Sequence, residues 1–336
     1  MKGFVNVDKI CVLLASYNGE QYIEEQLCSL FEQTVLPSAV IISDDNSTDL
    51  TWTILEKWQS KHPKLIYIYK NDTGVNGHVG NFSFLCTKAL ELDYDYFLFC
   101  DQDDVWLPNK IAKLVKKCKG IEADKGVPYP ILVHSDLLVV DCQLNLIANS
   151  FFEYQGLPAP TKHAFPKFLI QNVVTGCASL INRALLEKAA PLPNEVVVHD
   201  WWFALIASLT GQVAFVDEAL LMYRQHNSNA IGAIAVTKKK NIIFNVAKQL
   251  KAGSKHLYSS VKQAQQLQNT LQCYNNHQLN DFLSFHALNS KDKKQIVHQL
   301  INNPNSLIEY LSVYIILSIV TRVLKTRASK HKKALT

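Results

Sequence analysis

Three carboxylates stand within four consecutive residues of this chain, in the run Asp101-Gln102-Asp103-Asp104. The run follows an apolar, aromatic stretch, 94–100, that is typical of a buried β-strand. Carboxylates this close repel one another unless a cation lies between them, and their hard oxygens suit Mg²⁺ or Mn²⁺. The run predicts a divalent-cation site that also meets substrate phosphates. A solvated acidic turn is the alternative interpretation.

Two more polar clusters follow apolar runs nearer the N-terminus. Ser16-Tyr17-Asn18 comes after the run 10–15, and Asp44-Asp45-Asn46-Ser47 comes after the run 39–43. Because strands here alternate with helices, the pattern predicts an α/β fold with a mostly parallel sheet. Ligands bind at the carboxyl edge of such sheets, so we expect the three polar clusters to meet there.

Apolar spacing predicts the remaining elements of this region. Helices are expected over 20–32 and 50–59 and up to Leu90, and strands over 65–69, 131–136, 173–181, 213–216 and 220–224. An ordered loop is expected over 150–166, and a helix from His199 to about Leu209.

Composition favours a globular protein of more than one typical domain. The chain has 336 residues, of which 48% are hydrophobic and 10% aromatic, which excludes a disordered chain. Its eight cysteines include no C-x-x-C pair, so we expect reduced, buried thiols in the cytoplasm rather than zinc or disulfides. No signal peptide is expected before the first strand.

Charge divides the chain into two parts. Residues 1–232 carry a net charge of −8, whereas residues 233–336 carry +13. The uncharged stretch 310–321 is shorter than the ~20 residues that span a bilayer, and six basic residues follow it. This pattern predicts an anchor on an anionic membrane surface. A core helix with a solvated basic tail is the alternative, and the absence of a binding motif argues against nucleic acid.

The three polar clusters lie in the longer motifs A-S-Y-N-G, D-D-N-S-T-D and D-Q-D-D-V-W-L-P, and two further motifs follow, H-D-W-W-F-A-L and Y-R-Q-H-N-S-N-A-I-G. With these motifs the chain resembles the inverting glycosyltransferases of family 2, in particular the bacterial rhamnosyltransferase-like branch. The resemblance implies a GT-A nucleotide-sugar-binding domain over 1–232, followed by a helical basic extension over 233–336. The Q-x-x-R-W motif of processive relatives is absent, which argues for transfer of a single sugar.

The resemblance also implies roles for the acidic and basic residues. Asp103 would be the best metal ligand, with Asp101 and His226 as further ligands. Asp200 would be the general base on the acceptor hydroxyl, and His199 stands before it where relatives usually have an acid. Two alternatives stay open: Asp200 could instead cap its helix, and His226 could be an ordinary loop histidine.

Donor and acceptor contacts follow from the same resemblance. The acceptor would meet Gly176, Trp201 and Trp202, although one tryptophan could belong to the core. Asp44 and Asp45 could cap the next helix instead of binding nucleotide, and Tyr17 could be a core aromatic residue. The nucleotide-sugar would be bound by Ala15, Ser16, Tyr17, Asp44, Asp45, Asp101, Gln102 and Arg224.

The predicted function is metal-dependent transfer of one sugar, with L-rhamnose from dTDP-rhamnose as the suggested donor. A saccharide or lipid-linked saccharide would accept it during synthesis of a bacterial surface polysaccharide, such as a capsule or O-antigen. The enzyme would then lie in the cytoplasm, peripheral to the inner face of the cell membrane. A UDP-hexose donor and a non-catalytic nucleotide-sugar-binding protein are the alternatives. A nucleotidyltransferase is disfavoured because the first turn, from Ser16 to Glu20, lacks a glycine-rich basic loop.

Overall fold

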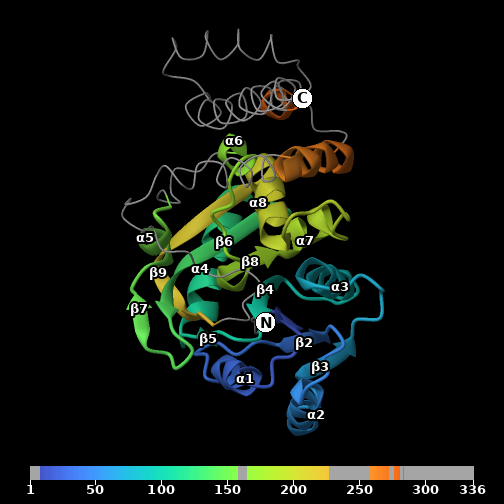
Figure 1. Cartoon of the computed structure of the whole chain (residues 1–336). Helices are drawn as coiled ribbons and strands as arrows, with labels where there is room; N and C mark the ends of the chain where they lie inside the picture. The colour runs from blue at the N-terminus through green and yellow to red at the C-terminus, as the bar shows by residue number, and fades with distance from the viewer. Residues whose placement is uncertain (1–7, 158–164, 227–257, 272–275, 281–282, 284–336) are drawn as a thin grey trace, which may run out of the picture. The chain divides into compact units, whose positions relative to one another are not determined.

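The computed structural model describes residues 8–157, 165–226, 258–271, 276–280 and 283 (Figure 1). Two compact units divide the chain: residues 1–163 with 173–236, and residues 164–172 with 237–336. We treat each unit by itself, and the predicted domain boundary after residue 232 stays a prediction. The described part of the second unit consists of α6 (Phe165–Phe168) and the helical residues 258–270, 277–280 and 283.

The first half of the larger unit alternates strands with helices, as the sequence predicts (Figure 1). Its elements are β1 (Ile10–Ser16), α1 (Ile23–Phe31), β2 (Ala39–Asp44), α2 (Thr51–Lys61), β3 (Ile66–Lys70), α3 (His78–Leu90) and β4 (Tyr96–Asp101). Each helix returns the chain so that the next strand runs parallel to the earlier ones.

The second half of this unit is less regular. Its elements are β5 (Val105–Trp106), α4 (Lys110–Lys125), β6 (Ile131–Val140), β7 (Leu146–Ala148), α5 (Phe151–Gln155), η2 (Gly176–Ala178), β8 (Ser179–Asn182), α7 (Arg183–Ala189), α8 (His199–Thr210) and β9 (Gln212–Arg224).

Some predicted element boundaries are wrong in this half. The expected strand over 173–181 is a strand only from Ser179, because Gly176 begins a short 3₁₀ turn. The two expected strands over 213–216 and 220–224 form the single strand β9, whose pairing with β6 shifts register beside Asp136. The expected loop over 150–166 contains α5, and residues 158–164 lie outside the described part.

The strands form one sheet in the order β3-β2-β1-β4-β8-β6-β9-β5, with β7 paired to β6. Parallel pairing joins β1 to β2 and β4, β2 to β3, and β6 to β9, and these ladders contain most of the paired residues. Short antiparallel ladders complete the sheet at β5, β7 and β8. The sheet is therefore mostly parallel, as predicted.

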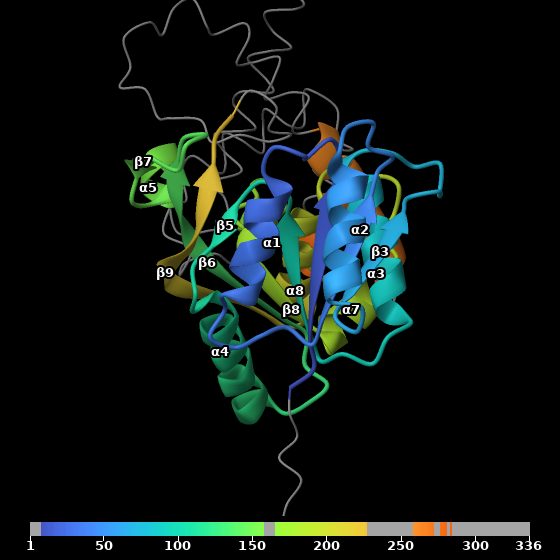
Figure 2. The ribbon, with the colours of Figure 1, turned by 90° about the horizontal axis from the view of Figure 1, so that it is seen from below.

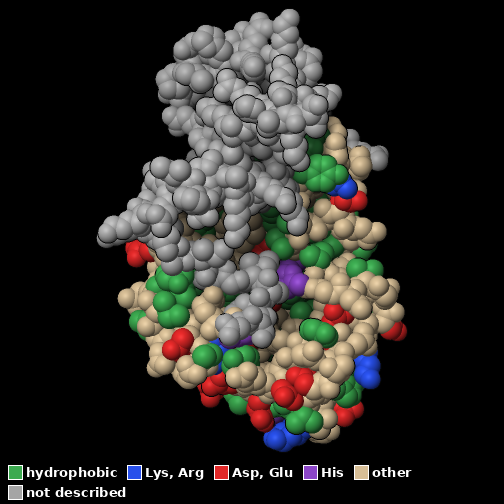
Figure 3. All heavy atoms as spheres, in the orientation of Figure 1, with side chains coloured by type: hydrophobic (Ala, Val, Ile, Leu, Met, Phe, Trp, Pro, Cys, Tyr) green, Lys and Arg blue, Asp and Glu red, His purple; other side chains and the backbone are tan. Residues whose placement is uncertain are grey.

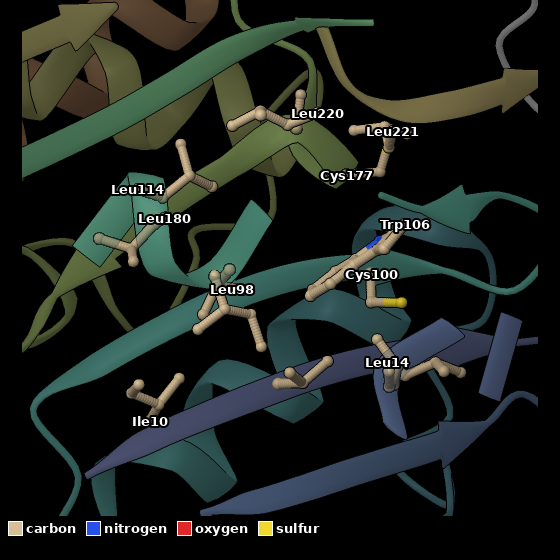
Figure 4. Close-up of a cluster of buried hydrophobic side chains, with 14 of the residues drawn as sticks. Ile10, Leu14, Leu98, Cys100, Trp106, Leu114, Cys177, Leu180, Leu220 and Leu221 are labelled. Carbon is tan, nitrogen blue, oxygen red and sulfur yellow. The ribbon is translucent and has the colours of Figure 1, made fainter. Parts of the chain in front are cut away.

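Helices cover both faces of this sheet, which explains why β1, β2 and β4 are apolar up to the polar residues at their carboxyl ends. In Figure 2, α1 and α2 lie in front of the strands and α8 lies behind them. On one face Leu14, Leu98, Cys100 and Trp106 belong to a buried apolar cluster (Figure 4). On the other face Phe99 contacts an aromatic ring of α3 and another of α8.

Charge and length of the described elements bear on the predicted membrane contact. Acidic side chains are exposed over the region of α1 and α2 on the face in Figure 3, in line with the negative N-terminal part. No helix among the described residues is long and apolar enough to cross a bilayer. The predicted anchor at 310–321 and the basic cluster after it lie outside the described residues.

Candidate functional site

The parallel register brings the three polar clusters to one edge of the sheet. Ser16 at the end of β1 pairs with Asp44 at the end of β2. Ala15, one residue earlier, pairs with Asp101 at the end of β4. The three clusters are therefore neighbours, as the sequence predicts, although 28 and 85 positions separate Ser16 from Asp44 and Asp101 along the chain.

Asp44 and Asp45 are buried and fix the loop after β2. The hydroxyl of Ser16 donates to Asp44 Oδ2 at 2.9 Å, and the Ser47 backbone N–H donates to Asp44 Oδ1 at 2.8 Å. Asp45 accepts hydrogen bonds from the Asn71 amide at 2.9 Å and the Gly77 backbone N–H at 2.6 Å. Because α2 has no side-chain cap, the helix-capping alternative for both aspartates is wrong.

Gln102 ties the acidic turn to the first turn. Its side-chain oxygen accepts from the Tyr17 backbone N–H at 2.8 Å, and its amide donates to the Tyr17 carbonyl at 2.9 Å. Gly19 makes room for it, since a Cβ atom there would collide with the Gln102 amide. The Tyr17 ring is 54% exposed, so the core alternative for Tyr17 is wrong and its side chain is open to a ligand.

The three carboxylates of the acidic turn differ in environment. Burial, followed by the charges of Asp103 and Asp200, raises the pKa of Asp101 to about 7. Burial and the other two carboxylates raise the pKa of the fully buried Asp104 well above its ordinary value. Asp103 Oδ2 lies 2.9 Å from His226 Nε2. This crowding of negative charge is the arrangement that a cation relieves.

Among the described residues, one group of side chains brings three possible ligand atoms close enough to hold that cation. Ligand atoms of Asp101, Asp104 and Cys177 lie within 4.8 Å of one another. Burial raises the pKa of the Cys177 thiol well above its ordinary value, and a protonated, soft sulfur suits Mg²⁺ or Mn²⁺ poorly. The predicted ligands Asp101, Asp103 and His226 offer oxygen and imidazole nitrogen, which suit a divalent cation better by their chemistry, and their assignment stays a prediction.

Arg224 supports the acidic turn. Its backbone N–H donates to Asp104 Oδ1 at 3.2 Å, and its Nε donates to the Asp103 carbonyl at 2.8 Å. The guanidinium also pairs with Glu25 and packs 4.6 Å from the Tyr22 ring centroid. The structure thus gives Arg224 a positioning role, and its predicted contact with a diphosphate stays a prediction.

Asp200 lies in the first turn of α8, beside the acidic turn. Its Oδ2 accepts from the Gly176 backbone N–H at 2.8 Å, and its Oδ1 accepts from the Trp201 backbone N–H at 2.6 Å. The N-cap of α8 is Val198, so the capping alternative for Asp200 is wrong. Its charge contributes to the raised pKa of Asp101, which brings the candidate base to the same site as the candidate metal ligand.

Gly176 makes room for a histidine rather than for an acceptor, which corrects its predicted role. A Cβ atom on Gly176 would lie 2.5 Å from His199 Nε2. The His199 ring stacks on Phe82 with centroids 3.9 Å apart, and neither ring nitrogen has a hydrogen-bond partner among the described residues. Burial lowers the pKa of His199 well below its ordinary value, so the ring is neutral at pH 7.

The sequence predicts that Trp201 and Trp202 contact the acceptor, but Trp202 is a core residue. Its side chain is fully buried, and its indole N–H donates to the Ala189 carbonyl at 2.9 Å. Trp201 is also buried, with 2% of its surface exposed. The burial of α8 from Trp201 to Ala207 explains the correction, because a run of residues buried around the whole helix leaves neither ring exposed.

Sequence reasoning missed several residues of this site. Asn71 and Gly77 hold Asp45, and Asn81 donates to the Ser16 carbonyl at 3.1 Å. His78 begins α3 with its Nε2 4.0 Å from Asp101 Oδ1. Lys110 is buried against the Cys177 carbonyl. The sequence offers one signal for these residues: Gly77 and His78 stand at the start of a helix, at the sheet edge where ligands bind.

Known proteins resemble this chain in sequence. The model of glycosyl transferase family 2 matches residues 11–189. A dTDP-rhamnosyl transferase, RfbG, of Shigella flexneri is 31% identical over 239 residues, or 68% of this chain and 76% of that relative. An uncharacterized glycosyltransferase of Haemophilus influenzae is 35% identical over 236 residues, or 66% of this chain and 67% of the relative.

A solved structure resembles this chain in fold. The crystal structure of GalNAc-T7 with UDP, GalNAc and Mn²⁺ matches with a TM-score of 0.51 and 14% sequence identity. The match covers 67% of this chain and 45% of that one.

Proposed function

Because the chain belongs to glycosyl transferase family 2, we propose that it moves one sugar from a nucleoside diphosphate donor to a saccharide acceptor, in the synthesis of a bacterial surface polysaccharide. The observation that carries the proposal is the meeting of Ser16, Asp44 and Asp101 at one sheet edge, with Asp200 beside them. Donor, cation and base would then lie within one site.

Three predictions from the sequence are confirmed. The family is that of the matched model and of the curated relatives. The α/β fold is that of the GT-A glycosyltransferases. The protein is a glycosyltransferase.

Mg²⁺ or Mn²⁺ would be held by Asp103, Asp101 and His226. Such a cation offsets, as a Lewis acid, the charge that builds on the departing diphosphate. The presence of three carboxylates in the single turn 101–104 supports the assignment, because a cation offsets the repulsion between such closely spaced groups. The structural neighbour of the same fold contains Mn²⁺ and UDP.

The donor would be dTDP-L-rhamnose, and the support is the name of the relative from Shigella flexneri. Asp45 would accept a hydrogen bond from a pyrimidine N–H, and the exposed Tyr17 ring would lie against the nucleotide. Ala15, Ser16, Asp44 and Gln102 would complete this region through backbone and side-chain contacts. A UDP-hexose is the alternative donor, since both nucleotides carry a pyrimidine.

Asp200 would take the proton from the acceptor hydroxyl as the sugar is transferred with inversion. The Gly176 and Trp201 N–H groups hold its two oxygens in one orientation, which pre-positions the base.

The acceptor would be a saccharide, or a saccharide on a lipid carrier. The basic extension over 233–336 would bring the catalytic unit to the anionic cytoplasmic face of the cell membrane, where such carriers are found. Its support is the sequence pattern alone: the uncharged stretch 310–321 next to six basic residues.

Replacing Asp200 with asparagine tests the proposal. We expect Asp200→Asn to bind the donor as the wild type does and to lose ~10²–10⁴-fold in kcat, because the amide cannot take the proton. Transfer from radiolabelled donor and calorimetric donor binding are the two measurements. An unchanged kcat would mean that another residue is the base.

A carboxylate outside the site provides the matched control. Asp217 is exposed on β9, and Asp217→Asn removes one negative charge, as Asp200→Asn does. We expect this control to keep wild-type kcat, which would separate the base role from a change in net charge.

A further inference from the structure

Lys110 is a buried lysine that the proposed mechanism does not yet use. It is the first residue of α4 and is fully buried. Its Nζ donates to the Cys177 carbonyl and lies 3.2 Å from the centroid of the Trp106 ring. Burial lowers its pKa to about 8, while the carboxylates of Asp104 and Asp101 oppose this shift, so it carries a positive charge at pH 7.

Fold stability alone does not favour a lysine at this position. Burying an ammonium costs several kcal/mol, and the positive end of a helix dipole repels it. An apolar side chain of similar length would fill the same space without either cost. What compensates the burial of Lys110 is the hydrogen bond to the Cys177 carbonyl, the contact with the Trp106 ring and the electrostatic attraction of Asp104 and Asp101.

The Cys177 carbonyl belongs to the turn that holds Asp200. In this turn, Gly176–Ala178, the Gly176 N–H donates to Asp200 Oδ2 at 2.8 Å. The Ser179 hydroxyl closes the turn by donating to the Gly176 carbonyl at 2.8 Å. The same short turn therefore contacts Lys110 through the Cys177 carbonyl and Asp200 through the Gly176 N–H.

We propose that Lys110 is a positioning residue that fixes the Gly176–Ala178 turn relative to the acidic turn, and through it the carboxylate of Asp200. Trp106 and Lys110 follow the acidic turn directly in sequence, so any movement of that turn reaches Lys110 within a few residues. The contact sets the distance between the departing diphosphate and the base. The proposal rests on the proposed function, because that function assigns the base to Asp200.

A double-mutant cycle tests the proposal, with Lys110→Met as the main variant, since methionine keeps most of the length without the charge. A misplacement of about 1 Å costs ~10²-fold in rate, so we expect kcat to fall ~10–100-fold in Lys110→Met. Donor KM and Mn²⁺ affinity, measured by titration, should stay within about two-fold. In the Asp200→Asn background the same change should lower kcat by less than about three-fold, because the positioned group is already gone.

The remaining outcomes overturn the proposal. An equal loss in both backgrounds would mean that Lys110 acts on the donor, and an unchanged kcat would mean that it positions nothing. Wild-type activity in Asp200→Asn alone would instead refute the proposed base. Lys116→Met, at an exposed position of α4, is the control and should change neither kcat nor KM.

A second variant keeps the proposal testable if Lys110→Met does not fold. Lys110→Arg keeps the charge and a donor, but its larger head displaces the Cys177 carbonyl, so kcat should fall in the wild-type background only. If both variants lose their cooperative thermal transition, Lys110 is required by the core and the positioning role is wrong.

Discussion

At the scale of single residues, the three carboxylates of the acidic turn have different neighbours and different exposure. Asp103 faces His226, Asp101 lies in register with Ala15, and Asp104 is buried against the backbone of Arg224. Only Asp103 and Asp101 are partly exposed, with 14% and 28% of their side chains accessible. These two are therefore the ones that a cation can reach.

Replacing Asp103 should abolish transfer and leave the fold intact. In Asp103→Ala the remaining carboxylates repel one another less, so we expect the melting temperature to hold or rise slightly. Mn²⁺ affinity, measured by calorimetry, should fall by at least ~10-fold, since a charged ligand is lost. Asp72→Ala, at an exposed loop position, is the control. Near-wild-type transfer by Asp103→Ala would contradict the metal assignment.

The buried His199 should make stability depend on pH. Its pKa in the folded protein is below the ordinary value of 6.5, so the unfolded chain binds the proton more readily. Stability is therefore complete above about pH 6.5 and is lost as the pH falls below it, by up to ~1.4 kcal/mol per pH unit.

His199→Asn isolates this effect, because asparagine does not titrate. The wild-type free energy of unfolding, minus that of the variant, should decrease between pH 6.5 and 5 in urea titrations. A difference that stays constant with pH would mean that the pKa of His199 is the same in the folded and the unfolded state, which would contradict the prediction.

How far the sequence predicted the site depends on whether strand pairing or side-chain packing brings its residues together. Ser16, Asp44 and Asp101 could be placed together, because parallel strands end at a common edge. The contacts of Gln102 with Tyr17 and of Lys110 with Cys177 could not, since they depend on side-chain packing across 85 and 67 positions. The burial of both tryptophans could not be predicted either, because the sequence does not show what α8 packs against.

At the scale of elements, the close contact between the Gly176 turn and α8 sets the place of Asp200. Gly176→Ala would put a methyl group 2.5 Å from His199 Nε2, so the start of α8 must move. We expect kcat to fall ~10²-fold, with donor affinity kept, because the base moves and the nucleotide contacts do not. Wild-type kcat in this variant would contradict the placement of Asp200.

Gly120→Ala is the matched control for that variant. Gly120 lies within the exposed part of α4, and nothing lies within 4 Å of a Cβ atom added there. Alanine should stabilise this helix by ~0.5–1 kcal/mol in urea titrations and leave kcat unchanged.

At the scale of the whole molecule, the charge asymmetry is the basis for our proposal that residues 233–336 contact an anionic membrane surface. Deleting residues 307–336 removes the uncharged stretch 310–321 and the basic cluster. We expect the truncated protein to stop floating with anionic liposomes, since each basic residue near such a surface contributes ~1 kcal/mol. High salt should weaken binding of the full chain. Equal flotation of both proteins would mean that the stretch belongs to the core.

The central claim is cation-dependent sugar transfer at the edge of the sheet where Ser16, Asp44 and Asp101 meet. The most direct measurement is the release of nucleoside diphosphate from dTDP-L-rhamnose and from several UDP-hexoses, by the full chain with a saccharide acceptor, with and without Mn²⁺. We predict turnover with dTDP-L-rhamnose that a chelator abolishes and Mn²⁺ restores. Turnover that is unaffected by the chelator, or no turnover with any of these donors, would contradict the account.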